Sequence, residues 1–391
     1  MKPDRILTRD FALSFLAQFT FSSVFSMMIP TIPIYLSRME ASESEIGVLV
    51  GSLSASSLIL RPLVGRALLK IPEKNFMITG ALIFTLSSLA YLFVLPFWPL
   101  FALRVFQGIG LAFFSTASFT FIANLVPETH RGQILSYFYL SINFAFALAP
   151  YFGMLLINHL SFPSNFKILF LLYTALSLSC FLITLKLKKT SMPPEANPFP
   201  KKQSLLSREA LRPSIVAFLV TVNWGALTAF FPLYALSQGV NNPGIFFGVF
   251  ALTLILVRGL GGKILDFFER QKVILPCLLG IIISTILLAF STNLSMFILV
   301  AIIWGTATAF LYPTLVAYTL DRVGSSRGPA MGTFTALTDL GAGVGSVIMG
   351  IILELTNYPF MFFCLTLTGI LNLLYFSVSV RKKEVDRYAH L

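Results

Sequence analysis

Two ionisable side chains stand inside long apolar stretches of the sequence, where a charge is costly. Asp339 lies near the middle of the stretch 329–354, and Arg104 lies within the stretch 100–126. If these stretches cross a membrane, each charge costs at least about 2.5–3.5 kcal/mol at the bilayer centre, so neither side chain should face lipid. Because desolvation disfavours its charged form, a buried carboxyl group can bind a proton near neutral pH. We interpret Asp339 as a proton-coupling residue, with a fixed ion pair or a hydrogen-bond anchor as alternatives.

The remaining polar residues argue against an enzyme. The three histidines are scattered along the chain, so the sequence predicts no metal site, and no cofactor is expected. A membrane-embedded enzyme would need paired catalytic groups at one membrane depth, and Asp339 and Arg104 are the only clear intramembrane charges that the sequence predicts. The glycine-rich run 259–263 lacks the spacing of a phosphate-binding loop. We therefore expect no enzymatic activity.

The composition indicates a membrane protein. Of the 391 residues, 56% are apolar and 11% are charged, whereas soluble domains average about 25% charged residues. A soluble globule of this size would need more charge to cover its surface. The net charge of +12 falls mainly between the apolar stretches and predicts no nucleic-acid partner. The expected partners are membrane lipid, protons and a small-molecule substrate.

The apolar stretches predict an all-α membrane protein with twelve transmembrane helices in two six-helix bundles. A helix needs about 20 apolar residues to cross a bilayer. Six such stretches precede a polar, proline-rich segment, and six more follow it. The expected domains are an N-terminal bundle (1–185), a cytoplasmic linker (186–213), a C-terminal bundle (214–380) and a cytoplasmic tail (381–391). The stretches themselves are 11–36, 46–69, 76–97, 100–126, 133–157, 168–185, 214–237, 244–266, 273–292, 295–320, 329–354 and 359–380.

The positions of the basic residues orient these stretches. If the N-terminus lies in the cytoplasm, all but three of the 28 lysines and arginines fall on the cytoplasmic side. The exceptions are Arg38 and Lys167 on the outside and Arg104 within a stretch. Cytoplasmic loops of membrane proteins carry such an excess of Lys and Arg. We expect a multi-pass protein of the plasma (inner) membrane with both termini in the cytoplasm.

The two halves of the sequence repeat each other at an offset of 196 to 199 residues. Corresponding pairs follow in order: Pro33 and Pro232, Gly108 and Gly305, and Arg131 and Arg327. The same offset pairs Asn143 with Asp339, an amide with a carboxyl. Halves of equal orientation predict an axis along the membrane normal and a transport site at their interface. Because internal symmetry needs no partner, we expect a monomer.

Two segments resemble motifs of the major facilitator superfamily, and the resemblance covers nearly the whole chain. Arg104–Ala112 is similar to the family's Arg-x-x-Gln-Gly-x-Gly-x-Ala motif, and Ala149–Gly153 is similar to the Gly-Pro-x-x-Gly motif of its antiporters. The resemblance implies alternating access and gives Arg104 a part in proton coupling. Substrate contact and a pairing with a neighbouring helix are the alternatives for Arg104. Small residues allow close helix approach at Gly108, Gly110, Ala112, Gly341, Gly343 and Gly345.

The resemblance also implies a gate in the cytoplasmic loops. It places Asp266 opposite the N-terminus of the fifth helix, where a carboxylate is favourable. In the first half Leu69 stands where the family has an Asp, so we expect an asymmetric gate. The alternative is that Asp266 is a solvated loop charge. The expected gate residues are Gly65, Arg66, Arg131, Gly262, Asp266 and Arg327.

In this fold the first, fourth, seventh and tenth helices line the cavity. With Asn143 from the repeat, the expected substrate-cavity residues are Gln18, Ser22, Gln107, Asn143, Asn223, Trp224 and Tyr312. Few polar groups among aromatic rings suit an amphipathic organic molecule. We expect a secondary active transporter that exports such a molecule in exchange for protons. The alternatives are a proton-driven uptake symporter, a facilitator, and a flippase for lipids or lipid-linked sugars.

Overall fold

The computed structural model describes residues 8–68, 70–93, 97–125, 131–159, 161–188, 207–261, 268–322 and 327–381. These residues form twelve α-helices and a final π-helical turn, and none of them lies in a strand. The first six helices are α1 (Arg9–Arg38), α2 (Glu43–Ala67), α3 (Glu73–Ala90), α4 (Trp98–Asn124), α5 (Arg131–His159) and α6 (Ser164–Leu185). The others are α7 (Arg208–Ser237), α8 (Gly244–Gly261), α10 (Arg270–Phe290), α11 (Leu294–Leu320), α12 (Arg327–Leu355), α13 (Tyr358–Tyr375) and the turn η2 (Phe376–Arg381).

Every predicted apolar stretch overlaps one of these helices. Ten helices are long and apolar enough to cross a membrane, and α3 and α8 are the two that fall short of that criterion within the described residues. The all-helical prediction is therefore confirmed at this level. The chain is a multi-pass membrane protein.

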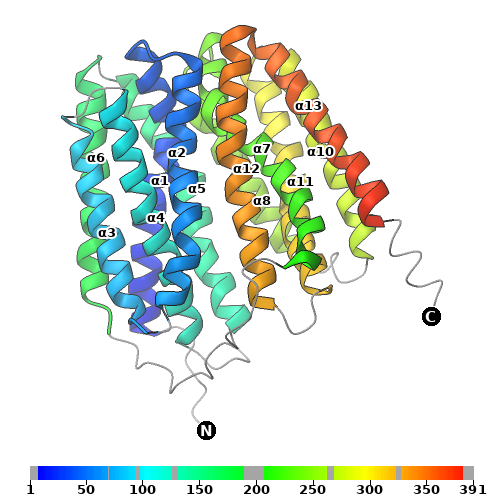
Figure 1. Ribbon diagram of the computed structural model, residues 1–391. Helices are drawn as coiled ribbons and strands as arrows, with labels where there is room; N and C mark the ends of the chain where they lie inside the picture. Colours follow the sequence, from blue (N-terminus) through cyan, green and yellow to red (C-terminus); the bar gives the residue numbers. More distant parts are fainter. Residues whose placement is uncertain are drawn as a thin grey trace, which may run out of the picture. The chain divides into compact units, whose positions relative to one another are not determined.

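The chain forms two compact units. The first consists of Met1–Ala41 and Ser52–Pro198, and the second of Ser42–Gly51 and Phe199–Leu391. Within the first unit, α1 packs against α5 and α6, and α3 packs against α4 and α6. Within the second, α7 packs against α12 and α13, and α10 packs against α11 and α13 (Figure 1). The four helix pairs named for the first unit thus recur in the second, with α7, α10, α11, α12 and α13 in the places of α1, α3, α4, α5 and α6.

Single contacts at positions related by the predicted repeat are also similar. A Cβ atom at Gly108 would lie 2.4 Å from the carbonyl oxygen of Leu53, and one at Gly305 would lie 3.2 Å from that of Phe250. Gly108 and Gly305 differ by 197 residues, as do Leu53 and Phe250. The two glycines therefore let equivalent helices approach closely in both units.

The helix starts follow the same repeat. The hydroxyl of Thr8 accepts a hydrogen bond from the backbone N–H of Phe11 (3.2 Å) at the start of α1. Ser207, 199 residues later, accepts one from the N–H of Ala210 (3.3 Å) at the start of α7. Such caps satisfy backbone donors that a helix leaves open at its N-terminus.

The beginning of α2 belongs to the second unit, where it lies against α12. A Cβ atom at Gly47 would lie 2.3 Å from the carbonyl oxygen of Ser346. The backbone N–H of Ser44 donates a 3.0 Å hydrogen bond to Oε2 of Glu354. This bond places the carboxylate of Glu354 at the N-terminus of α2, where an anion is favourable.

Each unit also fixes the chain end that leads to residues 189–206. In the first unit, Nζ of Lys74 on α3 donates hydrogen bonds to the carbonyl oxygens of Leu185 (2.8 Å) and Leu187 at the end of α6. In the second, the backbone N–H of Ser207 donates a 2.9 Å hydrogen bond to the buried hydroxyl of Thr333 on α12. The prediction of a linker over 186–213 depends largely on residues outside the described ones and stays a prediction.

Candidate transport site

The first unit holds a buried polar network around Gln107. Its Oε1 accepts 3.0 Å hydrogen bonds from Nη1 of Arg104 and from the hydroxyl of Tyr91, and its Nε2 lies 3.2 Å from Sδ of Met28. The side chain of Arg104 is 6% exposed and that of Gln107 is fully buried. One amide thus connects α1, the residue after α3, and α4.

Helical spacing explains the contact between Arg104 and Gln107 in this network. Arg104 and Gln107 are three residues apart on α4, so their side chains share one face. The motif in the sequence therefore predicts their proximity. Tyr91 and Met28 come from distant segments, and nothing in their sequence spacing points to Gln107.

A second polar group links α1 to α4 in the same unit. Nε2 of Gln18 donates to Oγ of Ser22 (2.9 Å), and the hydroxyl of Ser118 donates to Oε1 of Gln18 (2.9 Å). All three side chains are buried. These polar groups satisfy one another, so Gln18 and Ser22 connect helices in this structure.

The second unit has apolar side chains at the equivalent positions. With an offset of 197 residues, Arg104 corresponds to Ala301 and Gln107 to Trp304, and both of these are buried. At the same offset, Tyr91 and Ser118 correspond to Leu288 and Leu315. For the first helix of each unit the offset is 199, and Gln18 and Met28 correspond to Ala217 and Leu227. All four of these apolar residues are buried. The repeat therefore preserves helix packing and changes the chemistry of the core.

The predicted residues of the second unit form a different arrangement. The side chain of Asn223 on α7 is 1% exposed, and its Nδ2 donates to the carbonyl oxygen of Leu219 (3.0 Å). The indole of Trp224 stacks on the ring of Phe250 on α8, with centroids 5.0 Å apart. Tyr312 on α11 meets Phe334 on α12 edge to face, at 5.6 Å between centroids.

Asp339 is half-buried on α12. The helix lies very close to α7 just beyond it, since a Cβ atom at Gly341 would be 2.4 Å from the carbonyl oxygen of Phe218. Asn143, its counterpart in the repeat, is half-buried on α5. The structure therefore places Arg104, Gln107, Gln18, Ser22 and Asn143 in the first unit, and Asp339, Asn223, Trp224 and Tyr312 in the second.

The predicted cytoplasmic gate lies mostly outside the described residues. Gly262 and Asp266 are not among them. Arg131 and Arg327 are the first residues of α5 and α12, and the structure does not describe their side chains either. Gly65 and Arg66 lie exposed at the end of α2. The gate stays a prediction.

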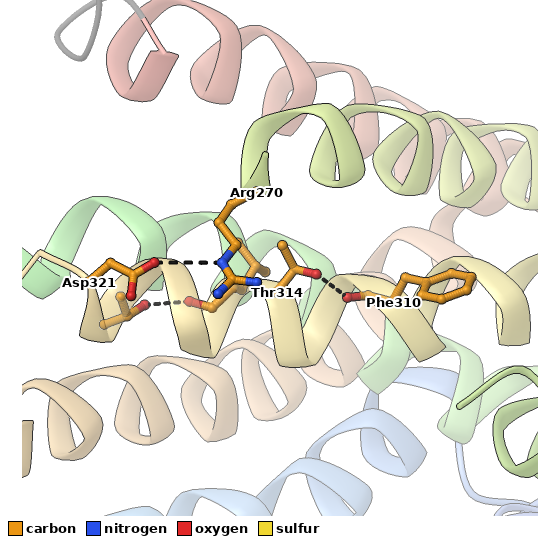
Figure 2. Close-up of polar contacts among 6 residues, drawn as sticks. Arg270, Phe310, Thr314 and Asp321 are labelled. Atoms are coloured by element: carbon orange, nitrogen blue, oxygen red, sulfur yellow. Dashed lines mark hydrogen bonds and ion pairs between the residues drawn. The ribbon is translucent and has the colours of Figure 1, made fainter. Parts of the chain in front are cut away.

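An ion pair that the sequence analysis did not predict joins α10 to the end of α11. Nε of Arg270 lies 3.6 Å from Oδ2 of Asp321, and Figure 2 shows the arginine reaching the residue that follows α11. On α11, seven residues before Asp321, the hydroxyl of Thr314 donates to the carbonyl oxygen of Phe310 (2.6 Å; Figure 2). Because Arg270 and Asp321 are 51 residues apart in the sequence, only the packing of α10 on α11 brings them together.

The fold and these buried charged and polar groups define a multi-span membrane transporter. The model of the Major Facilitator Superfamily matches residues 14–266 and, in a second match, residues 214–390. The chain belongs to this family, and it is a transporter rather than an enzyme.

Several relatives are named as exporters or resistance proteins. The staphylopine export protein of Staphylococcus aureus is 26% identical over 375 residues, which span 92% of each chain. Multidrug resistance protein 1 of Bacillus subtilis is 26% identical over 359 residues, 87% of this chain and 89% of the relative. The quinolone resistance protein NorA of Staphylococcus aureus is 22% identical over 345 residues, 84% of this chain and 86% of the relative.

Solved structures share the fold. The nucleoside transporter NupG superposes with a TM-score of 0.77 at 15% identity, over 95% of this chain and 98% of that one. The xylose transporter XylE from E. coli, in a partially occluded inward open conformation, superposes with a TM-score of 0.70 at 16% identity, over 95% and 97% of the two chains. At these identities the likeness establishes the fold alone.

Proposed function

We propose that this chain is a proton-coupled exporter of a small amphipathic organic molecule and works by alternating access. The observation that carries the proposal is the half-buried carboxyl of Asp339 on a helix of a transporter fold. An ionised carboxyl on a membrane-spanning helix is energetically costly, so its presence points to a function. Binding a proton is the simplest such function. The names of the three relatives support the outward direction.

In this proposal all twelve helices span the plasma membrane, in two six-helix bundles with both termini in the cytoplasm. The protein works as a monomer. A proton from outside binds Asp339 and favours release of the substrate, and substrate from inside favours loss of that proton. Arg104 takes part in this coupling through the Gln107 network. The polar and aromatic residues of α1, α4, α7 and α11 line the substrate cavity, and the loops around Asp266 form the inner gate.

Uptake is the second candidate function. The solved structures that share the fold include a nucleoside transporter and a xylose transporter, and both superpose over at least 95% of this chain. The same scaffold can therefore carry substrate in either direction, driven by a proton gradient or by the gradient of the substrate itself.

The test follows labelled lipophilic dyes and antibiotics in cells that lack their main efflux pumps. Wild type, Asp339→Asn, Asp321→Asn and empty vector are compared, each with and without a protonophore. We expect wild type to lower accumulation, and we expect Asp339→Asn and the protonophore each to abolish this effect. Asp321→Asn, which removes a carboxylate that is 61% exposed, is the matched control and should behave as wild type.

Each contrary result removes a defined part of the proposal. Export at full rate in Asp339→Asn that still responds to the protonophore would exclude Asp339 as the coupling residue. Export that ignores the protonophore would exclude proton coupling. Higher accumulation with wild type than with empty vector would reverse the direction and favour uptake.

A further inference from the structure

Hydrogen-bond satisfaction separates the predicted cavity residues into two groups. In the first unit, Gln18, Ser22 and Gln107 form hydrogen bonds with protein side chains. In the second unit, Oδ1 of Asn223 is buried and has no hydrogen-bond partner within the described part of the chain. A ligand must break an existing bond to reach the first group, whereas it would supply a missing bond to Asn223.

The amide of Asn223 is oriented by its own helix. Its Nδ2 group donates to the carbonyl oxygen of Leu219, one turn earlier on α7. With the nitrogen engaged, the oxygen is the atom left for a partner. An amide oxygen is neutral and accepts hydrogen bonds, so it selects an N–H or O–H donor and does not require a charged ligand.

The residue that follows Asn223 on α7 is aromatic. The half-buried indole of this residue, Trp224, stacks on Phe250, with the ring of Phe247 edge-on at 6.4 Å. The carbonyl of Phe250 lies against Gly305 on α11, one turn before Thr308, whose buried hydroxyl also has no partner within the described residues. Three helices of the second unit thus contribute flat apolar surface and two buried polar atoms without partners.

We propose that Asn223 Oδ1 accepts a hydrogen bond from an N–H group of a planar aromatic substrate whose ring stacks beside Trp224. Aromatic faces favour a flat ring, and an acceptor that is otherwise unsatisfied discriminates strongly against an analogue that lacks the donor. This inference rests on the proposed function and names the substrate class of its site. Asn223 is the residue that determines specificity, and Trp224 is the platform.

Two dyes with one ring system test the donor requirement. Proflavine carries two primary amino groups on an acridine, and acridine orange carries dimethylamino groups, which cannot donate, at the same positions. The ring nitrogen is common to both dyes, so the comparison tests the amino N–H donor. Binding of each dye to the purified full-length protein in lipid nanodiscs is followed by dye fluorescence. The ratio of the two dissociation constants cancels any difference in the fraction of folded protein between variants.

The variants separate the acceptor from the platform. Asn223→Leu keeps a side chain of similar shape and removes the oxygen, and Asn223→Ala serves if the leucine variant does not fold. Both should lower the preference for proflavine relative to acridine orange about five- to tenfold, as expected for one lost hydrogen bond. Trp224→Leu should weaken binding of both dyes by a similar factor and leave the ratio unchanged.

Asn372 on α13 provides the matched control. It is also buried, donates from Nδ2 to the carbonyl oxygen of Val216 (3.0 Å), and leaves Oδ1 without a partner in the described part of the chain. Asn372→Ala should leave the dye ratio at its wild-type value, because Asn372 is followed on α13 by Leu373, which offers no aromatic platform like that of Trp224.

The outcomes are decisive in both directions. A ratio within twofold of wild type in the Asn223 variants, or an equal change in Asn372→Ala, overturns the inference. So does a wild-type protein that binds neither dye. Export of the dyes is measured alongside binding. Dye binding that depends on Asn223 without proton-driven export would contradict the proposed function alone, and proton-driven export with an unchanged ratio would contradict this inference alone.

Discussion

The two units use the same helix contacts and fill them with different side chains. Gly108 and Gly305 allow equivalent helices to approach, yet the residue before Gly108 is the buried Gln107, and the residue before Gly305 is the buried Trp304. In the first unit an amide collects hydrogen bonds from Arg104 and Tyr91. In the second an indole occupies the same place. A duplicated scaffold can therefore keep its packing while one copy becomes polar and the other apolar.

The units also differ in the contacts of one extensively packed helix pair, which is α1 with α5 in the first unit and α7 with α12 in the second. Between α7 and α12, added Cβ atoms at Gly225, Gly341 and Gly345 would each lie 1.9 to 2.4 Å from a neighbouring atom. With the offset of 196 residues that pairs Asn143 with Asp339, Gly341 and Gly345 correspond to Ala145 and Ala149, and at an offset of 199 Gly225 corresponds to Ser26. The α7–α12 pair is thus in contact through backbone at glycines, where the α1–α5 pair has small side chains.

The largest effect is expected at this backbone contact between α7 and α12. Gly345→Val would place a Cβ atom 2.1 Å from the carbonyl oxygen of Val222, and backbone cannot yield as a flexible side chain can. We expect a loss of more than about 3 kcal/mol, seen as little folded protein after detergent extraction and size-exclusion chromatography. Leu148→Val, on α5 next to the equivalent Ala149 and 49% exposed, should cost less than about 1 kcal/mol. Equal yields of the two variants would contradict the contrast.

The next effect tests the polar core of the first unit. Gln107→Leu removes the acceptor of two buried donors, the guanidinium of Arg104 and the hydroxyl of Tyr91. Each donor left unsatisfied costs about 1–3 kcal/mol, so we expect about 2–4 kcal/mol and a melting temperature several degrees lower. Gln238→Leu, at the half-buried end of α7, should melt within about a degree of wild type. A stable Gln107→Leu would mean that the network adds nothing to stability.

A smaller change isolates one bond of that network. Tyr91→Phe removes the hydroxyl and keeps the ring, which stacks on Phe170 at 5.2 Å. We expect a loss of about 0.5–1.5 kcal/mol in thermal unfolding. In the Gln107→Leu background the same change should cost nothing more, because the acceptor is already absent. An undiminished effect in that background would show that the hydroxyl acts through another partner.

The smallest effect is expected at the exposed ion pair of the second unit. Asp321→Ala removes the partner of Arg270, whose side chain is 35% exposed, and surface pairs of this kind contribute about 0–1 kcal/mol. The shift in melting temperature should shrink further when salt is raised, since screening weakens the attraction in wild type. A shift as large as that of Gln107→Leu would erase the contrast between the buried network and the surface pair.

Sequence patterns predicted the features that depend on local spacing. The apolar stretches predicted the positions of the helices, with the largest differences at the end of α3 and at the start of α7. The repeat offset predicted that Gly108 and Gly305 are equivalent, and both lie close to a carbonyl oxygen of a neighbouring helix. Gly341 and Gly345 were expected to allow close approach, and they do. The partners of Gln107 and Gln18 could not be predicted, because Tyr91, Met28 and Ser118 reach them only through the packing of separate helices. The roles of Asp339 and of the gate residues stay predictions.

The hydrogen bonds of Lys74 and Ser207 bear on how two separately made halves of the chain would assemble. Each bond lies inside one unit, so a cut in the chain between Leu187 and Ser207 would leave both in place. What such a cut removes is the covalent connection, which keeps two partners at an effective concentration on the order of millimolar. Two halves made as separate chains should therefore each retain these bonds. The contacts of Ser42–Gly51 with α12 would form only when the halves assemble, which would depend on how much of each the membrane contains.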